Sequence, residues 1–518
     1  MKTIFTDALI IGTGFGGAAP ALRLSQAGFK TIILEKGPHI DPGRDFKMTQ
    51  DPKYVTKYIK SLKGNNLSLN YVEGLGGGSG FYEMLSLRTP SMAFEQKNGN
   101  GNRYWPKQIN RSVLDPYYEI SEKMLCVRQI SKKAVPKTGL VFSLLMKRLG
   151  YSADRAPFAE KHCIDSGFCV TGCVFGAKQS LHLNYLPQAK SAGTQILCEM
   201  DAKVIKPLGN FTTHGELNNL ESTPYRYEVT SLSKGEKYRF RTKILILAGG
   251  TIGSAVLLLR SKKYLRHLSK HLGKSIAFNG SVKTAGILPS WCPDGDMYTG
   301  RSVPGMVSFQ FLNSHGVMVI PGKPFPLQTI AAARFSIRNK EEKNGYWGKS
   351  NVELMKLFRH RVLILIGIGM GAPKGRISLN CNNEPVLDLN LNDSIRAYYN
   401  KTKKLLESIL KDSGCQLLNV ELVDKLGKPY KDIHFVSSHQ LGSCKMADSK
   451  RMGVLNFEGE AFDYPGLYVS DGASIPTSLA VNPALTILAN AERISAYIVR
   501  KYSKNRKVLA VVNNRKNP

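Results

Sequence analysis

Four residues in the first part of the chain have the types and spacing that bind phosphate and ribose. Gly12, Gly14 and Gly17 form a G-x-G-x-x-G turn, and Glu35 follows eighteen residues after the last glycine. In such a turn the first glycine allows a tight bend, the second lets the backbone approach a pyrophosphate, and the third permits close helix–strand packing. The acid is placed to accept hydrogen bonds from an adenosine ribose. These residues predict a dinucleotide site but do not distinguish FAD from NAD.

Three later stretches also contain residues that could do chemistry. The run YVEGLGGGSG at 71–80 is rich enough in glycine to let the backbone pass close to a flat or phosphorylated group. HQLGSCKM at 439–446 contains a histidine, whose ordinary pKa suits proton transfer near neutral pH. VNPALTILANAER at 481–493 contains an asparagine directly before a proline. Taken alone, His439 would be interpreted as a satisfied core histidine and the last stretch as an ordinary capped helix.

The elements that position the first turn can be predicted from hydrophobic patterning. Residues 7–11 are typical of a buried parallel strand, 20–28 of an amphipathic helix, and 31–35 of a second strand. The helix N-terminus of such a βαβ unit binds phosphates through its free N–H groups and its dipole. Residues 244–250, ILILAGG, predict another core strand, followed by a helix.

Other helices are predicted from capping residues and spacing. Asn482 is expected to be an N-cap with Pro483 at the first helical position, so that the positive end of a long helix is directed at whatever lies before it. A reduced, negatively charged flavin would suit that place. Asp115 with Pro116 predicts a helix over 114–125 in the same way, and 400–415 predicts an amphipathic helix.

Together these stretches resemble the glucose–methanol–choline (GMC) oxidoreductases, a family of FAD enzymes that oxidise alcohols. The resemblance runs from residue 6 to about 500 and is greatest to the cholesterol oxidase branch. It is carried by IIGTGFGGAAPALRLSQAGFKTIILE, by FCVTGCVFGAKQSLHLNYLPQA at 168–189, by HQLGSC and by VNPALTI, in this order. The resemblance implies FAD as the cofactor, bound without a covalent link because no motif demands one.

The family resemblance implies an α/β fold in which a Rossmann-like FAD-binding domain is interleaved with an α+β substrate domain whose sheet roofs the flavin. The expected FAD-binding segments are 1–44, 71–112, 188–282 and 450–503. The expected substrate-domain segments are 45–70, 113–187 and 283–449, and 504–518 is expected to be a basic C-terminal tail.

The family roles can be transferred to residues of this chain. The resemblance implies that FAD is contacted by Gly12, Gly14, Gly17, Glu35, Gly76, Gly77, Gly78, Val204, Ala248, Gly249, Asp471 and Asn482. It also implies that His439 and Asn482 are catalytic: the histidine holds the substrate hydroxyl, as base or as orienting group, and the asparagine orients the alcohol and polarises the flavin. The carbinol hydride would go to flavin N5.

Two positions depart from the family pattern. The cholesterol oxidases have an active-site glutamate linked to double-bond isomerisation, and here Gln310 or Phe311 stands in its place. Neither is a base, which puts isomerisation in doubt. The asparagine of the family's flavin loop aligns with Tyr82, so that contact with the flavin is also in doubt.

Composition and charge limit the remaining possibilities. Lys and Arg total 72 against 39 Asp and Glu, a formal net charge of +33. This excess favours anionic surroundings, but the basic residues are spread along the chain, so that nucleic acid is not an expected partner. A solvated surface is the first interpretation, and peripheral contact with an anionic membrane is the alternative.

No targeting segment is visible, and the longest apolar stretch, 362–373, is too short for a bilayer. A cytoplasmic protein is therefore expected, with peripheral membrane contact as the alternative.

The nine cysteines predict reduced thiols rather than a disulfide framework. Cys163, Cys169 and Cys173 are spaced C-x5-C-x3-C, which matches no standard zinc or iron–sulfur site, so a metal is not expected.

These observations predict FAD-dependent oxidation of a hydrophobic, sterol-like or lipid-like alcohol to its carbonyl, with O2 or another electron acceptor. The alternative hypothesis is a sterol- or lipid-binding protein that retains its flavin and has lost efficient turnover.

Overall fold

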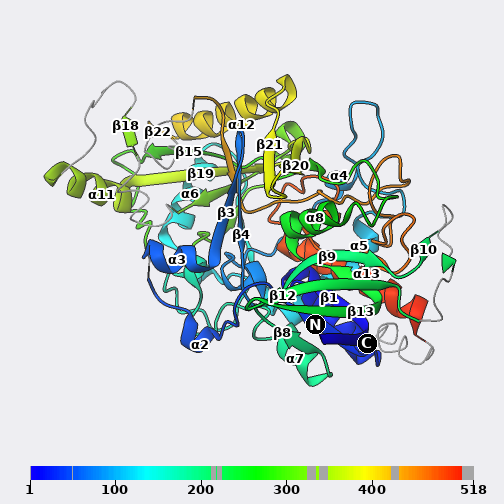
Figure 1. Cartoon of the computed structure of the whole chain (residues 1–518). Helices are drawn as coiled ribbons and strands as arrows, with labels where there is room; N and C mark the ends of the chain where they lie inside the picture. Colours follow the sequence, from blue (N-terminus) through cyan, green and yellow to red (C-terminus); the bar gives the residue numbers. More distant parts are fainter. Residues whose placement is uncertain are drawn as a thin grey trace, which may run out of the picture.

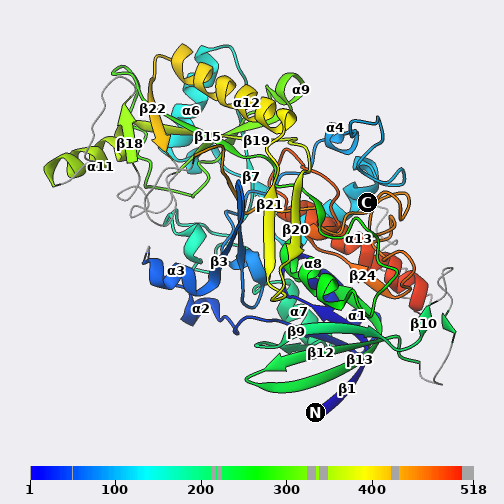
Figure 2. The same ribbon diagram turned by 45° about the horizontal axis from the view of Figure 1, so that its top comes forward.

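The computed structural model describes residues 2–49, 51–211, 217–218, 224–323, 334–337, 348–421 and 431–503. The predicted basic tail at 504–518 lies outside the described residues. In Figures 1 and 2, the first strand and the last helix lie at one end of the molecule, and a sheet from the middle of the chain lies at the other. Segments from the beginning and the end of the described chain, which are far apart in sequence, therefore pack together.

Seven strands form the largest sheet, in the order β8-β2-β1-β13-β12-β9, with β24 also paired to β13. Their bounds are β1 Lys2–Ile11, β2 Thr31–Leu34, β8 Gln195–Leu197, β9 Asp201–Pro207, β12 Tyr227–Ser233, β13 Glu236–Leu247 and β24 Leu467–Val469. β1 pairs in parallel with both β2 and β13. Strands covered on both faces are apolar throughout, which explains the run from Ala8 to Ile11. β1 is longer than the predicted strand because Lys2–Thr6 also pair with β13.

Four helices pack together beside this sheet: α1 Phe15–Gln26, α5 Arg111–Met124, α7 Tyr185–Ser191 and α13 Ala484–Tyr502. Glu492 of α13 joins three of them. Its carboxylate accepts a hydrogen bond from Arg23 Nε of α1 at 2.7 Å and from the Tyr185 hydroxyl of α7 at 2.7 Å. α8, Gly250–Ser261, packs against β9.

An antiparallel sheet of five strands forms the second unit, in the order β17-β19-β15-β22-β18. Its strands are β15 Val282–Ile287, β17 Val317–Gly322, β18 Arg334–Ile337, β19 Val362–Gly369 and β22 Gln416–Glu421. α11, Lys349–Arg361, leads into β19, and α12, Asp393–Asp412, packs on β15, β19 and β22. α12 begins earlier than the helix predicted over 400–415 because Asn392 caps it, with its side-chain oxygen accepting from Ile395 N at 3.1 Å.

Smaller elements connect the two large sheets. β23 Phe435–Ser437, β4 Leu67–Val72 and β3 Ile59–Lys63 form one sheet, and β14 Lys274–Ile276, β20 Gly375–Leu379 and β21 Pro385–Leu389 form another. The two-stranded ladders are β5 Val127–Gln129 with β7 Pro157–Ala159, β6 Asp154–Arg155 with β16 Met306–Val307, and β10 Asn210–Phe211 with β11 Leu217–Asn218. The remaining α-helices described are α2 Pro42–Asp45, α3 Pro52–Tyr58, α4 Ser91–Phe94, α6 Lys137–Arg148 and α9 Leu312–His315.

The start predicted for the helix near Asp115 is wrong. α5 begins at Arg111, and the capping residue is Asn110, whose side-chain oxygen accepts from Val113 N at 3.0 Å. Pro116 lies inside the helix. Asp115 instead accepts hydrogen bonds from Arg111 Nε at 2.7 Å and Arg88 Nη1 at 2.9 Å. An ion pair within the helix and one to a neighbouring segment explain its position.

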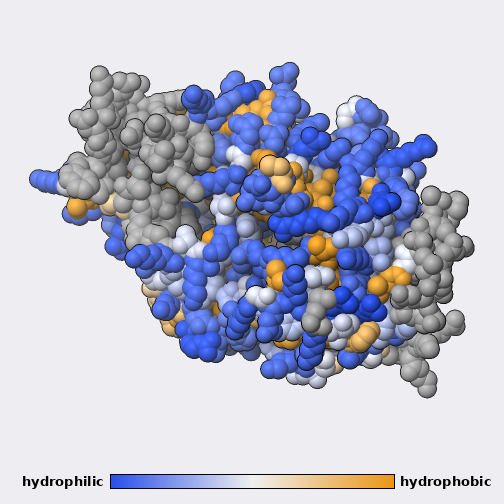
Figure 3. Space-filling model, viewed as in Figure 1, coloured by the Kyte–Doolittle hydropathy of each residue, from blue (hydrophilic) through white to orange (hydrophobic). Residues whose placement is uncertain are grey.

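The strands of the two large sheets can be compared with the predicted segments, although β4 spans the predicted boundary between residues 70 and 71. Every strand of the seven-stranded sheet comes from segments predicted for the FAD-binding domain, and the five-stranded sheet comes from 282–421. The residue-level domain boundaries stay a prediction. No helix of the described chain is long and apolar enough to cross a bilayer. The face in Figure 3 is mainly hydrophilic, with hydrophobic residues in small groups.

Candidate active site

The first glycine turn joins β1 to α1, and its glycines have different roles. Gly12 has φ +105°, and a Cβ there would lie 2.3 Å from Ala248 O. A Cβ on Gly17 would lie 1.9 Å from Gly12 O. Protein packing therefore requires these two glycines. A Cβ on Gly14 would meet only Gly77 Cα, at 4.0 Å, so Gly14 borders space that the protein leaves open.

Glu35 lies at the carboxyl end of β2 and is buried. Its Oε2 accepts from Thr13 N at 3.1 Å and from Thr13 Oγ1 at 2.6 Å, and its Oε1 accepts from Gly37 N at 2.9 Å. Burial raises the pKa of Glu35, while these hydrogen bonds oppose the rise. Thr13 Oγ1 in turn accepts from Gly76 N at 2.9 Å. Thr13, which the sequence reasoning missed, thus connects the predicted ribose acid to the second glycine loop.

The second loop, Gly76–Gly78, lies directly beside the first. Gly76 has φ +77°, and a Cβ there would fall 2.4 Å from the ring of His182. A Cβ on Gly77 would lie 3.0 Å from Gly14 Cα, whereas one on Gly78 would meet nothing within 4 Å. The two glycine-rich segments therefore approach each other closely and leave open space at Gly14 and Gly78.

Ala248, Gly249 and Asp471 meet at the start of α8. Ala248 N donates to Ile11 O at 2.8 Å, and Asp471 Oδ2 accepts from Gly250 N at 2.7 Å and from Ser254 Oγ at 2.6 Å. Burial raises the pKa of Asp471 to about 6. Asp471 therefore fixes the start of α8. A Cβ on Gly16 would lie 2.6 Å from Asp471 Cα, so the start of α1 is also in contact with it.

Val204 belongs to an edge strand of the seven-stranded sheet. Val204 lies within β9 opposite Thr230, and the register continues across β12 and β13 to Thr3, near the beginning of β1. The backbone beside Glu35 belongs instead to the residues just before β9: Met200 N donates to Glu35 O at 2.8 Å. Met200 therefore lies beside Glu35, and a contact of Val204 with the adenosine stays a prediction.

His439 and Asn482 face each other, 43 residues apart in sequence. Asn482 Nδ2 lies 3.2 Å from His439 Nε2. His439 Nδ1 and Asn482 Oδ1 are buried and have no hydrogen-bond partner among the described residues. Burial, with a smaller contribution from the Lys283 ammonium, lowers the pKa of His439 to about 4. The imidazole is therefore neutral near pH 7 and can accept a proton.

The prediction that Asn482 caps the last helix is wrong. α13 begins at Ala484 with Pro483 in the capping position, and no side chain caps it. The amide that was expected to bind the first helical N–H groups is directed to His439 instead. Its function is therefore tied to the histidine.

One charged side chain that the sequence reasoning missed lies within electrostatic range of His439. Lys283 of β15 interacts with both His439 and Glu83, which follows the second glycine loop. Lys283 is exposed and Glu83 partly exposed, yet burial dominates the pKa of each, raising that of Glu83 and lowering that of Lys283.

Tyr82, Gln310 and Phe311, which stand where the family pattern has other residues, contact neighbouring protein groups. Tyr82 donates its hydroxyl hydrogen bond to Gln179 O at 2.9 Å, and its ring lies 5.3 Å from that of Phe15. Gln310 Oε1 accepts from Ser152 Oγ at 3.3 Å, and Phe311 is buried against Tyr151. In the described part of the chain, no hydrogen bond or ring contact joins Gln310 or Phe311 to His439.

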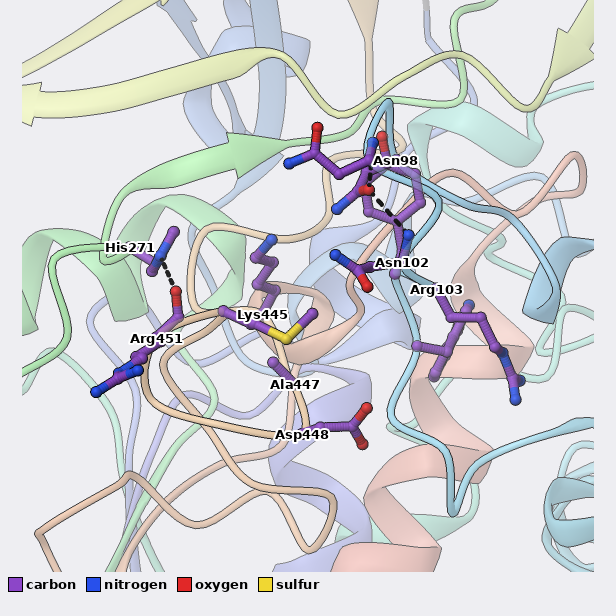
Figure 4. Close-up of a pocket in the computed structure, with 12 residues that line it drawn as sticks. Asn98, Asn102, Arg103, His271, Lys445, Ala447, Asp448 and Arg451 are labelled. Carbon is purple, nitrogen blue, oxygen red and sulfur yellow. Dashed lines mark hydrogen bonds between the residues drawn. The ribbon is translucent and has the colours of Figure 1, made fainter.

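No three His, Cys, Asp or Glu side chains of the described chain are arranged to hold a metal. A polar pocket of about 250 Å³, shown in Figure 4, is lined by Asn98, Arg103, His271, Lys445 and Arg451 among others. His271 Nε2 bonds to Arg451 O at 2.7 Å there. None of the predicted cofactor or catalytic residues lines this pocket.

The residues at the glycine turns fit a dinucleotide. Open space at Gly14 and Gly78 would receive a pyrophosphate, and the start of α1 offers N–H groups to it. His439 Nδ1 and Asn482 Oδ1, which have no partner among the described residues, can still form hydrogen bonds.

A family model for the N-terminal part of the GMC oxidoreductases matches residues 6–276, and one for the C-terminal part matches residues 373–491. This chain belongs to the GMC oxidoreductase family.

GMC oxidoreductases are FAD flavoproteins, and membership supports FAD-dependent oxidation of CH–OH donors. The chain is 23% identical to the long-chain-alcohol oxidase FAO4B of Arabidopsis thaliana, over 97% of this chain and 68% of the relative. It is 24% identical to cholesterol oxidase of Mycobacterium tuberculosis, over 95% of this chain and 90% of that one. The fold matches formate oxidase of Aspergillus oryzae with a TM-score of 0.67 at 14% identity, over 97% of this chain and 99% of that one.

The Asn482–His439 contact predicts the effect of substitution at Asn482 in this GMC enzyme. Asn482→Leu removes a hydrogen bond of about 1 kcal/mol, and flavin reduction by alcohol should slow about fivefold or more. Asn482→Ser is too short to reach His439 and should slow it similarly. Because the Asn482 side chain caps no helix, neither variant should have the lower unfolding temperature that follows from loss of a helix cap. Rapid-mixing absorbance and calorimetry measure the two effects; full rescue of the reduction rate by serine would contradict this assignment.

A second prediction concerns pH. Because the folded-state pKa of His439 is about 4, below its ordinary value of 6.5, the neutral form is favoured in the fold. Stability contributed by the neutral histidine should be full above pH about 6.5 and be lost as pH falls towards 4. Flavin reduction should likewise persist below pH 6 and fall only near pH 4. Lys283→Met should move that ionisation upward. If the rate of flavin reduction in the unsubstituted enzyme falls with a midpoint near pH 6.5, the prediction is wrong.

Proposed function

We propose that this GMC oxidoreductase oxidises a hydrophobic, sterol-like or lipid-like alcohol to its carbonyl with non-covalently bound FAD. The observation that carries the proposal is the His439–Asn482 pair, 3.2 Å apart, with its remaining polar atoms unpartnered. The alcohol-oxidase and cholesterol-oxidase relatives support the substrate class.

The face of the five-stranded sheet that carries Lys283 supports a hydrophobic substrate. Opposite residues of an antiparallel ladder share a face; Lys283 is opposite Ile366, and Ile366 is opposite Ile320. α12 packs on the other face, where a Cβ on Gly367 would lie 2.8 Å from a Thr402 methyl group. Ile366 is only partly buried, so this otherwise apolar face has surface available for a substrate body.

The residues of the pair have separate tasks. His439 is neutral and accepts the hydroxyl proton of the alcohol, while the Asn482 amide orients the imidazole and the hydroxyl. FAD, when bound, supplies the acceptor for the carbinol hydride. The glycine turns, Thr13 and Glu35 hold the nucleotide end in this proposal. Gln310 and Phe311 offer no base for double-bond isomerisation.

One observation favours the alternative of a flavin-retaining sterol or lipid binder with impaired turnover. The Tyr82 hydroxyl is bonded to Gln179 O and is not free to replace the family's flavin-loop asparagine. The retained His439–Asn482 pair favours turnover, and an experiment separates the two functions.

The test is anaerobic addition of alcohols to the yellow holoenzyme, followed by absorbance. A panel of sterols, long-chain alcohols and short polar alcohols should bleach the flavin with the first two classes. Binding without bleaching would favour the alternative. Admitting air afterwards tells whether O2 accepts the electrons.

A second experiment tests how FAD is attached. Denaturing the protein should release FAD into the supernatant; flavin left in the precipitate would contradict non-covalent attachment.

A further inference from the structure

The polar pocket shown in Figure 4 contains none of the residues that were predicted to bind FAD or substrate. It is formed by a loop that includes Asn98 and Asn102, by a segment that includes Lys445 and Asp448, and by His271. Its volume of about 250 Å³ is roughly eight times the space that one molecule occupies in liquid water. The pocket therefore has room for a polyatomic ion or a small organic molecule.

Lys445 is the cation that enters this pocket. Figure 4 shows its side chain between His271 and Asn102. Among the described residues the Lys445 ammonium makes no hydrogen bond and no ion pair. Burial lowers the pKa of Lys445, and no acidic side chain in the described part of the chain offsets that effect. Because a confined charge without a partner is unfavourable, Lys445 is suited to pair with an anionic ligand.

Arg103 and Asp448, which also line the pocket, already have partners in the protein. Arg103 Nη2 lies 3.1 Å from Glu95 Oε1, so this guanidinium has a counter-charge. Asp448 Oδ1 accepts a hydrogen bond from Lys107 N at 2.9 Å. Neither residue neutralises the charge of Lys445.

The uncharged groups of the pocket add hydrogen-bond donors. Asn98 Oδ1 accepts from Asn100 N at 2.9 Å and from Asn102 N at 3.1 Å, which leaves Asn98 Nδ2 as a donor. Trp105 also lines the pocket, and its buried indole Nε1 has no hydrogen-bond partner among the described residues. An ammonium and an indole N–H can only donate. A ligand that satisfies these groups must accept hydrogen bonds and carry negative charge.

The charges around the pocket favour a dianion over a monoanion. Burial lowers the pKa of His271, and three ammonium groups lower it further. These belong to Lys270, Lys274 and Lys445. A phosphate group carries about −1.5 to −2 charges near neutral pH and offers three acceptor oxygens, whereas a carboxylate carries a single charge on two oxygens. A phosphate group therefore matches this pocket better than a carboxylate does.

We propose that the pocket binds a phosphate-type dianion, either inorganic phosphate or the phosphate group of a small phosphomonoester. Lys445 pairs with its charge, and Asn98 Nδ2 donates to one of its oxygens. The ligand joins the loop at Asn98 to the segment at Lys445, so its binding should raise the unfolding temperature. The proposal concerns a second ligand beside FAD and does not depend on oxidation of an alcohol.

The first test is calorimetric titration of the FAD-saturated holoenzyme near neutral pH and at constant ionic strength. Saturation with FAD fills the space at Gly14, which would otherwise compete for phosphate. Inorganic phosphate, glycerol 1-phosphate and succinate are compared. Phosphate or the phosphomonoester should bind saturably and about tenfold or more tightly than succinate, because a group with nearly two charges is attracted more strongly to Lys445.

The two phosphate compounds distinguish the sources of the ligand. Tighter binding of glycerol 1-phosphate would assign the pocket to a phosphorylated metabolite, and tighter binding of inorganic phosphate would assign it to the free ion. No saturable binding of either compound, or equally tight binding of succinate, would overturn the proposal.

Substitutions assign the binding to Lys445 and Asn98. Lys445→Met removes the charge, and Asn98→Asp keeps the acceptor for the loop but replaces the donor with a negative oxygen. Each should weaken phosphate binding about tenfold to a hundredfold. Lys270→Met is the matched control, because Lys270 also acts on His271 but does not line the pocket. It should change the affinity by about twofold or less. An equal loss in this control, or unchanged affinity in both other variants, would overturn the assignment.

Thermal unfolding provides a second measurement and a check on folding. Without phosphate, Lys445→Met should unfold at or above the temperature of the unsubstituted protein, because it removes an unpaired charge. Phosphate should raise the unfolding temperature of the unsubstituted protein and of Lys270→Met, but not that of Lys445→Met or Asn98→Asp. An equal rise in all four proteins would place the phosphate elsewhere and refute the proposal.

Discussion

Replacing His439 with asparagine should slow flavin reduction by the best alcohol by about 10²–10⁴-fold, the scale of a general acid–base group. The cofactor should remain bound, because the glycine turns, Thr13 and Glu35 lie in other segments. In the proposed mechanism the neutral imidazole accepts the proton, and asparagine has similar polarity but no basic nitrogen. Anaerobic rapid mixing gives the rate, and the flavin-to-protein absorbance ratio gives occupancy.

His271→Asn provides the control for the His439 variant. His271 also has a pKa lowered by burial, but it bonds to Arg451 O in the polar pocket. This variant should reduce its flavin at the unsubstituted rate. If His439→Asn behaves in the same way, the proposed proton transfer is wrong and His439 is a structural residue.

The second large effect should separate two glycines of one turn. In Gly17→Ala the new methyl carbon would lie 1.9 Å from Gly12 O, so the apoprotein itself should be strongly destabilised. In Gly14→Ala the methyl group meets only Gly77 Cα, at 4.0 Å, and projects into the open space. The apoprotein should therefore unfold at nearly the same temperature. Its FAD affinity should fall about tenfold to a hundredfold, since overpacking costs about 1–3 kcal/mol.

Titration of each apoprotein with FAD and calorimetric unfolding without FAD measure the two effects. The contrast between Gly14 and Gly17 is the critical result, because both substitutions add the same group. If Gly14→Ala binds FAD as tightly as the unsubstituted protein, the pyrophosphate does not pass over Gly14.

The parts that sequence patterns predicted well are local. The strand, turn, helix and second strand around Gly12–Glu35 form within one short segment, so spacing alone contains the necessary information. Helix starts were predicted less well. Asp115 and Asn482 both precede proline and satisfy a local capping rule, but Arg88 and His439 bind their side chains instead. These partners lie outside the local window, so capping propensity could not identify them.

Lys283, whose charge acts on His439, could not be found from sequence, because it lies on a strand far from His439 along the chain and matches no spacing rule. Val204 illustrates a different difficulty. A resemblance at low identity assigns the adenosine side to Val204 of β9, and that assignment stays a prediction. The hydrogen bond from Met200 N to Glu35 O, which brings the chain just before β9 beside the predicted ribose acid, is not encoded in a short motif.

The packing of α13 on α1 has a consequence for biogenesis. Arg23 and Glu492, which form an ion pair at 2.7 Å, are 469 residues apart. At ribosomal speeds of roughly 5–20 residues per second, α1 emerges tens of seconds before its partner exists. Throughout that interval its apolar side needs shielding, which makes the nascent chain a client for chaperones. FAD is therefore expected to bind only after translation. Nascent chains stalled before residue 484 should not retain FAD.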